Sequence, residues 1–178
     1  MIIMKKIKII AVFVVMGLSV LCHFLYEWNN NFIFSILSPV NESIWEHMKL
    51  MVTPVLLYGI FEWLYYKKKN INHDNLLLSL CISSIIGIIV YLIPYLIIDK
   101  FIGHNMIVSI CLLFLDYCFI EYLSFKIVNY KKIKYSNYIG VILLFLIYFL
   151  FYYFTYNTPH TYLFYDTKDK IYGIKNWT

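Results

Sequence analysis

The stretch LLLSLCISSIIGIIVYLIPYLII, residues 76–98, decides the fold of this chain because it contains no charged side chain. An α-helix rises about 1.5 Å per residue, so roughly 20 such residues cross the ~30 Å hydrocarbon core of a bilayer. The apolar character is continuous and does not alternate with polar residues, as it would in a membrane β-strand. This segment therefore predicts a transmembrane helix.

Four further apolar runs lie on either side of this segment. The five predicted spans cover about residues 7–26, 50–66, 76–98, 106–125 and 138–156. Mean hydropathy is +0.71 and only 14% of the residues are charged, which is unlike a soluble domain. No linker or low-complexity stretch divides the chain. We expect an all-α protein, a polytopic membrane bundle of five transmembrane helices, forming a single domain over residues 1–178.

The basic residues predict the orientation of the bundle. The net charge of +5 comes from lysine alone, because the chain has no arginine. The lysines gather before the first span (Lys5, Lys6, Lys8), after the second (Lys67, Lys68, Lys69) and after the fourth (Lys126, Lys131, Lys132, Lys134). Lysine-rich loops stay in the cytoplasm, so we expect the N-terminus inside and the C-terminus outside. Lysines confined to membrane edges argue for membrane lipid as a partner and against nucleic acid.

Two further features bear on location. The excess of Lys, Ile, Asn, Tyr and Phe is typical of an AT-rich bacterial genome, so we expect a multi-pass protein of a bacterial cell membrane. The first span is followed by no Ala-x-Ala cleavage site, which favours a retained helix over a cleaved signal peptide. All four cysteines fall inside predicted spans, where they are expected to be packed thiols rather than disulfides.

The most polar part of the chain is SPVNESIWEH, residues 38–47, between the first two spans. Ser38 followed by Pro39 favours a helix that starts there, with a capping hydroxyl and a tolerated proline. If that helix continues into the second span, one stripe carries Glu42, Glu46, Lys49 and Thr53. The alternative is an interfacial helix whose polar side simply faces water.

This stretch supplies most of the candidate site residues. Glu42, Glu46 and His47 are the candidate acid–base groups, and Asn41 and Trp45 are candidate ligand-binding residues. His23 and Glu27 are four residues apart, a spacing that can chelate a metal from one helix face. The tail adds His160, a third candidate metal ligand, and Asp166 on the same predicted side of the membrane. We therefore expect a polar outer site, for which a divalent metal is one possibility and an acid–base pair another; ordinary interfacial side chains are the alternative.

A second group of ionisable residues lies inside the predicted spans. Asp116 falls near the middle of the fourth span, where a charge costs roughly 2.5–3.5 kcal/mol, so it must be protonated, paired or facing a cavity. We count it as a candidate ligand-binding residue. Glu62 and Glu121 lie about one turn from cytoplasmic lysines, and pairing with those lysines is their simplest interpretation. A transport path built from these three carboxylates is the alternative function.

Three strings carry a resemblance to a known family: HFLYEW at residues 23–28, SPVNESIWEHMK at residues 38–49, and the closing pattern from Pro159 to Ile174. They resemble a family of small uncharacterised multi-pass membrane proteins of Firmicutes, over essentially the whole chain. The resemblance implies a membrane protein with a domain of unknown function and no assigned activity.

The sequence favours an integral membrane protein with an outer polar site for a lipid-like or amphiphilic ligand. A metal-assisted hydrolase is the enzymatic form of this hypothesis. A small transporter, or the ligand-binding subunit of one, is the alternative. The residues identify neither an enzymatic activity nor a protein partner.

Overall fold

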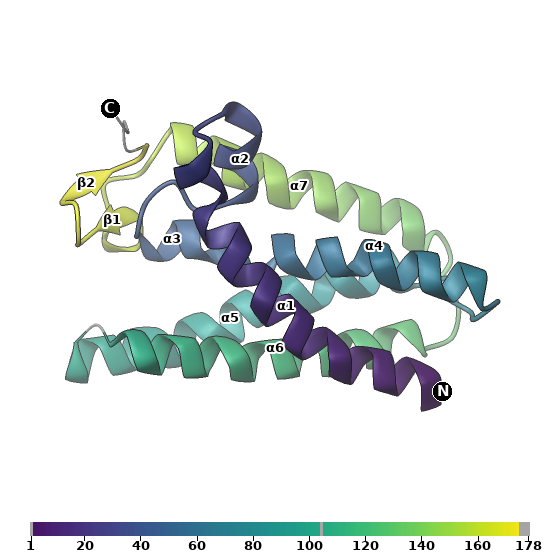
Figure 1. Cartoon of the computed structure of the whole chain (residues 1–178). Helices are drawn as coiled ribbons and strands as arrows, with labels where there is room; N and C mark the ends of the chain where they lie inside the picture. The colour runs from purple at the N-terminus through teal and green to yellow at the C-terminus, as the bar shows by residue number, and fades with distance from the viewer. Residues whose placement is uncertain (1, 104, 175–178) are drawn as a thin grey trace.

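Long helices account for most of the chain. The computed structural model describes residues 2–103 and 105–174. Its elements are, in order, α1 (Ile2–Trp28), α2 (Phe32–Leu37), α3 (Ile44–His47), the 3-10 turn η1 (Met48–Met51), α4 (Thr53–Lys68), α5 (Leu76–Ile102), α6 (Met106–Val128), α7 (Ser136–Tyr156), the 3-10 turn η2 (Tyr162–Phe164), β1 (Tyr165–Asp166) and β2 (Ile171–Tyr172). The expected all-α architecture is confirmed, with one small hairpin added at the end (Figure 1).

Four helices, α1, α5, α6 and α7, are long and apolar enough to cross a membrane. They contain the predicted spans at residues 7–26, 76–98, 106–125 and 138–156. The remaining predicted span, residues 50–66, coincides with α4, which has 16 residues. That length is shorter than the roughly 20 residues of an ordinary crossing. By length and composition, the described residues thus hold four membrane-length helices rather than five.

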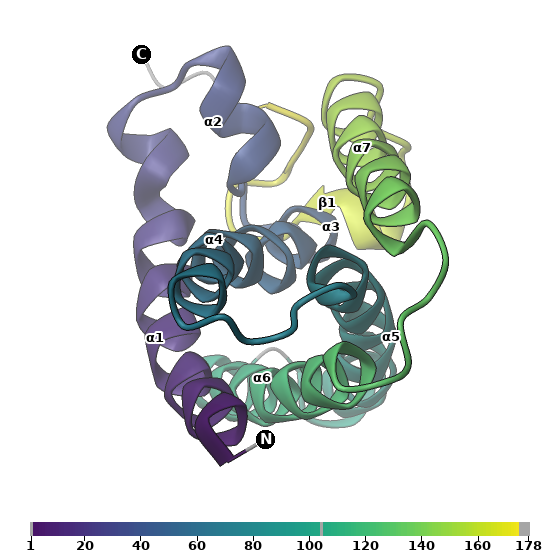
Figure 2. The ribbon, with the colours of Figure 1, turned by 90° about the vertical axis from the view of Figure 1, so that its right-hand side faces the viewer.

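The helices pack side by side with α4 near the centre (Figure 2). α1 contacts both α4 and α6, and α5 contacts both α6 and α7. Ala11, Val15, Val55 and Ile120 are fully buried in the interior. Large apolar side chains on the outward faces remain exposed, for example Phe145, as expected for surfaces that meet lipid.

The segment before α4 differs from its prediction. Residues 38–43 are not helical: Ser38 caps the end of α2, and Ser43 caps the start of α3 by accepting from the backbone of Glu46. A 3-10 turn then separates α3 from α4. The predicted helix start at Ser38 is therefore wrong, because its hydroxyl donates backwards to the Phe34 carbonyl. No single helical stripe carries the four polar residues that were expected to share one.

The chain after α7 folds back onto α3. β1 and β2 pair antiparallel, with Tyr165 opposite Tyr172. In Figure 1 this hairpin lies at the end of the bundle where α1 and α7 finish and α3 begins. We call this the hairpin end of the bundle; the opposite end holds the loops that follow α4 and α6.

Candidate functional site

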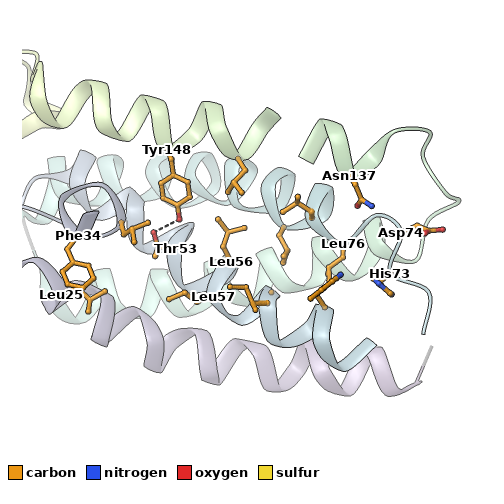
Figure 3. Close-up of a pocket in the computed structure, with 17 residues that line it drawn as sticks. Leu25, Phe34, Thr53, Leu56, Leu57, His73, Asp74, Leu76, Asn137 and Tyr148 are labelled. Atoms are coloured by element: carbon orange, nitrogen blue, oxygen red, sulfur yellow. Dashed lines mark hydrogen bonds between the residues drawn. The ribbon is translucent and has the colours of Figure 1, made fainter. Parts of the chain in front are cut away.

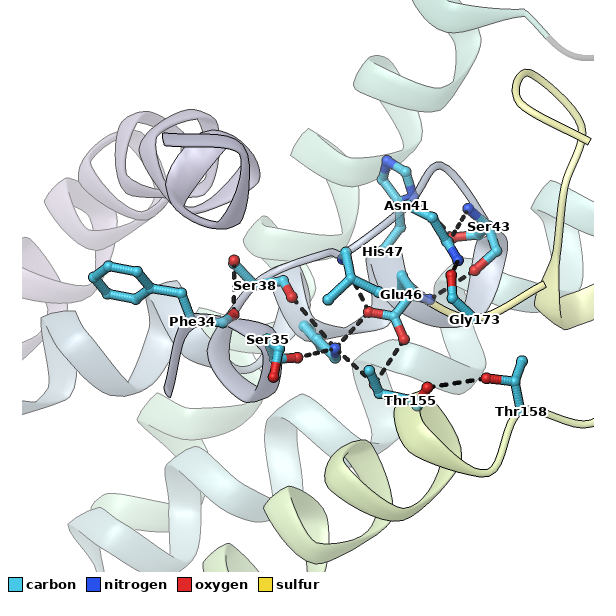
Figure 4. A network of polar contacts seen from close by, with 12 residues as sticks. Phe34, Ser35, Ser38, Asn41, Ser43, Glu46, His47, Thr155, Thr158 and Gly173 are labelled. Carbon is cyan, nitrogen blue, oxygen red and sulfur yellow. Dashed lines mark hydrogen bonds and ion pairs between the residues drawn. The ribbon is translucent and has the colours of Figure 1, made fainter. Parts of the chain in front are cut away.

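The polar stretch from Ser38 to His47 lies at the hairpin end and divides into a buried part and an accessible part. The buried part is centred on Glu46 and Lys49, which form an ion pair. Lys49 Nζ also donates to the Ser35 carbonyl at 2.6 Å, and to Thr155 Oγ1 at 2.9 Å. Figure 4 shows how these contacts join α2, α3 and the end of α7.

Both oxygens of the Glu46 carboxylate accept hydrogen bonds. One oxygen accepts from Lys49 and from the Val40 backbone N–H, and the other accepts from Thr155 at 2.8 Å. A buried ion pair with several hydrogen bonds fixes the shape of the polar loop.

Two more predicted residues hold the C-terminal segment. The Asn41 amide donates to the Gly173 carbonyl at 2.6 Å, and its oxygen accepts from the Ser43 backbone. The Glu42 backbone N–H donates to Asp166 Oδ2 at 2.9 Å. Asp166 is fully buried, and its other oxygen accepts from two backbone N–H groups of the hairpin turn. These contacts make the polar loop and the hairpin one unit.

Trp45 gives that unit its apolar contact. Its ring stacks on Phe164 at 5.0 Å between centroids and meets Phe151 and Phe154 of α7 edge to face. Aromatic clusters of this kind bury a large apolar area and add directional contacts. Trp45 therefore anchors η2 against α7, a packing role that differs from the ligand-binding role predicted for it.

The accessible part consists of His23, Glu42 and His47. Their ligand atoms lie within 4.8 Å of one another. Nε2 of His23 is 3.1 Å from Nε2 of His47, and Glu42 Oε2 is 3.4 Å from His47 Nε2 and 3.8 Å from His23 Nε2. Each side chain is roughly a third exposed. Helix α1 and the polar stretch thus bring two imidazoles and a carboxylate to one point.

The hydrogen bonds around His47 fix which of its nitrogens is free. Nδ1 lies 2.9 Å from the Ser43 carbonyl, which can only accept, so Nδ1 carries the hydrogen. The lone pair of the neutral ring is then on Nε2, which points toward His23 and Glu42. A histidine held in this way by a backbone carbonyl is the usual arrangement of a metal ligand. The His23 Nδ1 atom is buried without a hydrogen-bond partner among the described residues.

A cavity of about 280 Å³ opens beside His23 and Glu42. Its wall combines apolar surface, including Phe24 and Val40, with the polar groups of Glu27 and Lys168. Lys168 Nζ lies 3.8 Å from Glu42 Oε1, an exposed ion pair at the rim. Glu27 lines the cavity but does not belong to the group of close ligand atoms.

The tail histidine lies apart from this group. The His160 ring stacks on Tyr172 of the hairpin, with centroids 4.5 Å apart. It is not part of the His23–Glu42–His47 group within residues 2–103 and 105–174. Of the three predicted metal ligands, the structure places His23 in the cluster, Glu27 at its edge and His160 outside it.

A larger cavity of about 780 Å³ lies between α4, α5 and α7 (Figure 3). Leucine is its most frequent lining residue, with His73 and Asp74 at one end and Leu25 and Phe34 at the other. A hydrogen bond of 3.1 Å between Thr53 and Tyr148 lies along its wall. This space is apolar and lacks the chemistry of the smaller cavity, so we place the candidate site at the smaller one.

The three carboxylates of the predicted spans have different surroundings. Asp116 is buried, and neither of its oxygens has a hydrogen-bond partner in the described part of the chain. Glu62 and Glu121 instead flank Lys8, with Nζ–O distances of 2.6 and 3.0 Å. Five residues separate Asp116 from Glu121 on α6, which at 3.6 residues per turn turns them to different faces.

The partner of Glu62 and Glu121 was not foreseen. The lysines next to them in sequence contact aromatic rings instead: Lys67 lies over Trp63, and Lys126 over Tyr122. Lys8 was interpreted as part of a solvated basic flank, yet it is buried in α1. The one sequence feature that could have predicted this burial is the position of Lys8, which lies deeper in the apolar run than Lys5 and Lys6.

Fold and site together define the class of protein: an α-helical chain with four membrane-length helices and a polar cluster where the helix ends meet a folded-back tail. The chain belongs to DUF6512, a family of unknown function, whose pattern matches residues 1–174. No curated protein matches the chain. No solved structure matches it either.

Proposed function

We propose that this protein is a multi-pass membrane protein with a divalent-metal site formed by His23, Glu42 and His47, and that it acts on an amphiphilic ligand by metal-assisted hydrolysis. The observation that carries the proposal is the convergence of two imidazole nitrogens and one carboxylate oxygen from separate segments. Interfacial side chains that only met water would have no reason to meet one another.

The spacing of these atoms supports a transition metal such as zinc. Ligand atoms around a tetrahedral zinc with bonds of 2.0–2.1 Å lie roughly 3.3 Å apart. The observed separations of 3.1, 3.4 and 3.8 Å bracket that value. Two histidines and one carboxylate are a ligand set of catalytic zinc sites, in which the fourth position is kept for water.

The surroundings support an amphiphilic ligand. The cavity beside His23 and Glu42 combines an apolar wall with Glu27 and Lys168. In the proposed reaction Glu27 accepts a proton from the attacking water, and Lys168 faces a negatively charged head group. The long apolar cavity begins at Leu25, two residues from His23, and offers room for an acyl chain.

We propose that the chain spans a bacterial cell membrane five times, with the N-terminus inside. The four long apolar helices support a membrane location. The helical segments α3, η1 and α4 follow one another over residues 44–68, which provides the length for a fifth crossing. The lysine distribution supports this orientation and, with it, an outer-leaflet position of the metal cluster. Reporter fusions at the loop after α4 and at the C-terminus test this, because opposite locations are expected.

Zinc binding by the purified protein tests the site. We expect one zinc ion per chain, retained through gel filtration and measured by elemental analysis, and a loss of binding in His23→Ala. The matched control is His160→Ala, which removes a histidine stacked on Tyr172 and leaves the cluster intact. Equal zinc content in the wild type and His23→Ala would refute the metal site. With zinc bound, hydrolysis of lipid-like esters and amides, compared between the wild type and Glu27→Gln, tests the reaction class.

A further inference from the structure

A second ionic cluster lies deep in the opposite half of the bundle. Lys8 Nζ of α1 contacts Glu62 Oε2 of α4 at 2.6 Å and Glu121 Oε2 of α6 at 3.0 Å. It also donates to Ser124 Oγ at 2.9 Å. The side chains of Lys8, Glu62 and Glu121 are at most 4% exposed. Helices distant in sequence therefore bring one ammonium and two carboxyl groups together, away from water.

The charges of this cluster do not balance. With both carboxyl groups ionised, one ammonium leaves a net charge of −1 in a buried site. Lys8 is the one cation that pairs with either carboxylate in the part of the chain that the structure describes. Burying an uncompensated charge is far more costly than burying a neutral group. A bound cation is needed to complete the cluster, and the smallest is a proton.

The remaining titratable groups around the cluster do not supply it. Tyr58 and Tyr66 of α4 are the other titratable side chains that face it. The Tyr58 hydroxyl donates to the Ile7 carbonyl, and the Tyr66 hydroxyl donates to Glu62 Oε1 at 3.3 Å. α5 contributes Ser79 and α6 contributes Ser124, neither of which titrates in the range of carboxyl groups. The excess charge therefore belongs to the two carboxyl groups themselves.

The contacts distinguish between the two carboxyl groups. Both Glu62 oxygens accept hydrogen bonds, one from Lys8 and one from Tyr66. Glu121 touches Lys8 in an ion pair, but neither of its oxygens has a hydrogen-bond partner among the described residues. Glu62 is thus held as a carboxylate, while Glu121 has an oxygen free to take a proton.

We propose that Lys8, Glu62 and Glu121 form an intramembrane proton-binding site in which Glu121 carries one exchangeable proton. Binding adds a proton to the Glu121 carboxylate and breaks no covalent bond. This site is independent of the metal cluster, which lies at the hairpin end. Buried carboxyl groups of this kind are what proton-linked membrane proteins use to take up and release a proton.

Two serine hydroxyls extend from the site toward one end of the bundle. Ser124 Oγ, which contacts Lys8, lies 3.0 Å from Ser79 Oγ. Ser79 lies in the first turn of α5, beside the loop that contains Asn75. Exchange is therefore expected with the water at the lysine-rich end of the bundle, opposite the hairpin.

Infrared spectroscopy of the full chain in liposomes tests the proposal. A protonated carboxyl group has a separate C=O stretching band, and ¹³C-labelled glutamate shifts that band away from any aspartic acid band. At neutral pH we expect a glutamic acid band in the wild type that shifts in ²H₂O, and its loss in Glu121→Gln. Asp116→Asn is the matched control on the same helix, and it should retain the labelled band.

Two results would overturn the proposal. One is a wild-type spectrum without a glutamic acid band at neutral pH, which needs no variant to fold. The other is a band of unchanged intensity in Glu121→Gln. The measurement is repeated in sodium and in potassium buffers: a spectrum that is the same in both supports the proton, and a band that sodium removes would identify a sodium site instead. Thermal unfolding gives a second readout: because Glu121 is neutral and Glu62 is the charged partner, Lys8→Met should lower the melting temperature strongly and Glu121→Gln only slightly. Equal losses in the two variants would also overturn the proposal.

Discussion

Glu42 and Glu46 are four residues apart in one short polar stretch, yet their surroundings differ in almost every respect. Glu46 is buried, and its carboxylate accepts hydrogen bonds from Lys49, Thr155 and a backbone N–H. The Glu42 carboxylate is a third exposed and faces two imidazole rings at the edge of a cavity. The difference teaches that a dense polar motif can combine a structural support with a chemical site.

The buried pair explains why the accessible group is held in place. Lys49 and Glu46 tie α2, the polar loop and α7 together, and the loop so fixed carries Glu42. A metal site needs ligands whose positions are set before the ion binds, because ordering them otherwise costs free energy. Variants of the buried pair and of the accessible cluster can separate structural support from metal binding.

Replacing Lys49 by methionine should destabilise the protein most. The change leaves the Glu46 carboxylate buried without its cation, and breaking one side of a buried ion pair costs about 3–5 kcal/mol of the free energy of unfolding. Denaturant unfolding in detergent micelles measures it. The matched control is Lys132→Met, whose exposed pair with Asp74 contributes about 0–1 kcal/mol. Equal losses in both variants would show that Lys49 is not the support described above.

Replacing Glu42 by glutamine should reduce zinc affinity with little effect on folding. It removes the anionic ligand, so we expect a loss larger than the roughly 10–100-fold that changes in outer-shell partners cause. Competition with a zinc-binding dye measures the affinity. Glu46→Gln is the counterpart, expected to lower stability. If Glu46→Gln lost zinc while remaining as stable as the wild type, the roles assigned to the two residues would have to be exchanged.

Replacing Asn41 by alanine should loosen the hairpin. The variant leaves the Gly173 carbonyl and the Ser43 N–H without their partners, at a cost of about 1–2 kcal/mol. Faster proteolysis of the segment after α7 is the expected readout. Asn129→Ala serves as the control, because its amide bonds only to the Phe125 carbonyl of its own helix. Unchanged cleavage in Asn41→Ala would mean that Trp45 and the Glu42–Asp166 hydrogen bond hold the tail without Asn41.

Removing Lys168 should have the smallest effect and the opposite sign. Its exposed ammonium competes with a metal for the Glu42 carboxylate, from 3.8 Å away. We expect Lys168→Ala to leave stability unchanged within about 1 kcal/mol and to raise zinc affinity slightly, by an amount that decreases with added salt. A decrease in affinity would show that Lys168 supports the site rather than competing for its carboxylate.

The sequence by itself determined the helical architecture. Continuous apolar runs near residues 7–26, 76–98, 106–125 and 138–156 can satisfy their backbone hydrogen bonds in lipid only as helices, whatever their neighbours are. The sequence also identified residues 38–47 as the main source of candidate site residues. It could not give the local conformation there, because the Ser38 hydroxyl bonds backwards to α2 instead of capping a new helix.

Only the tertiary structure decided which polar residues meet. His23 and His47 are 24 positions apart in the sequence, and Lys8 and Glu121 are 113 positions apart. Such pairs form through helix packing and loop closure, whose register no local pattern records. The same packing assigned Glu46 to a buried support, Glu42 to an accessible cluster and His160 to a stack on Tyr172. Residue types show which chemistry is available, and burial together with contact geometry decides which side chains can perform it.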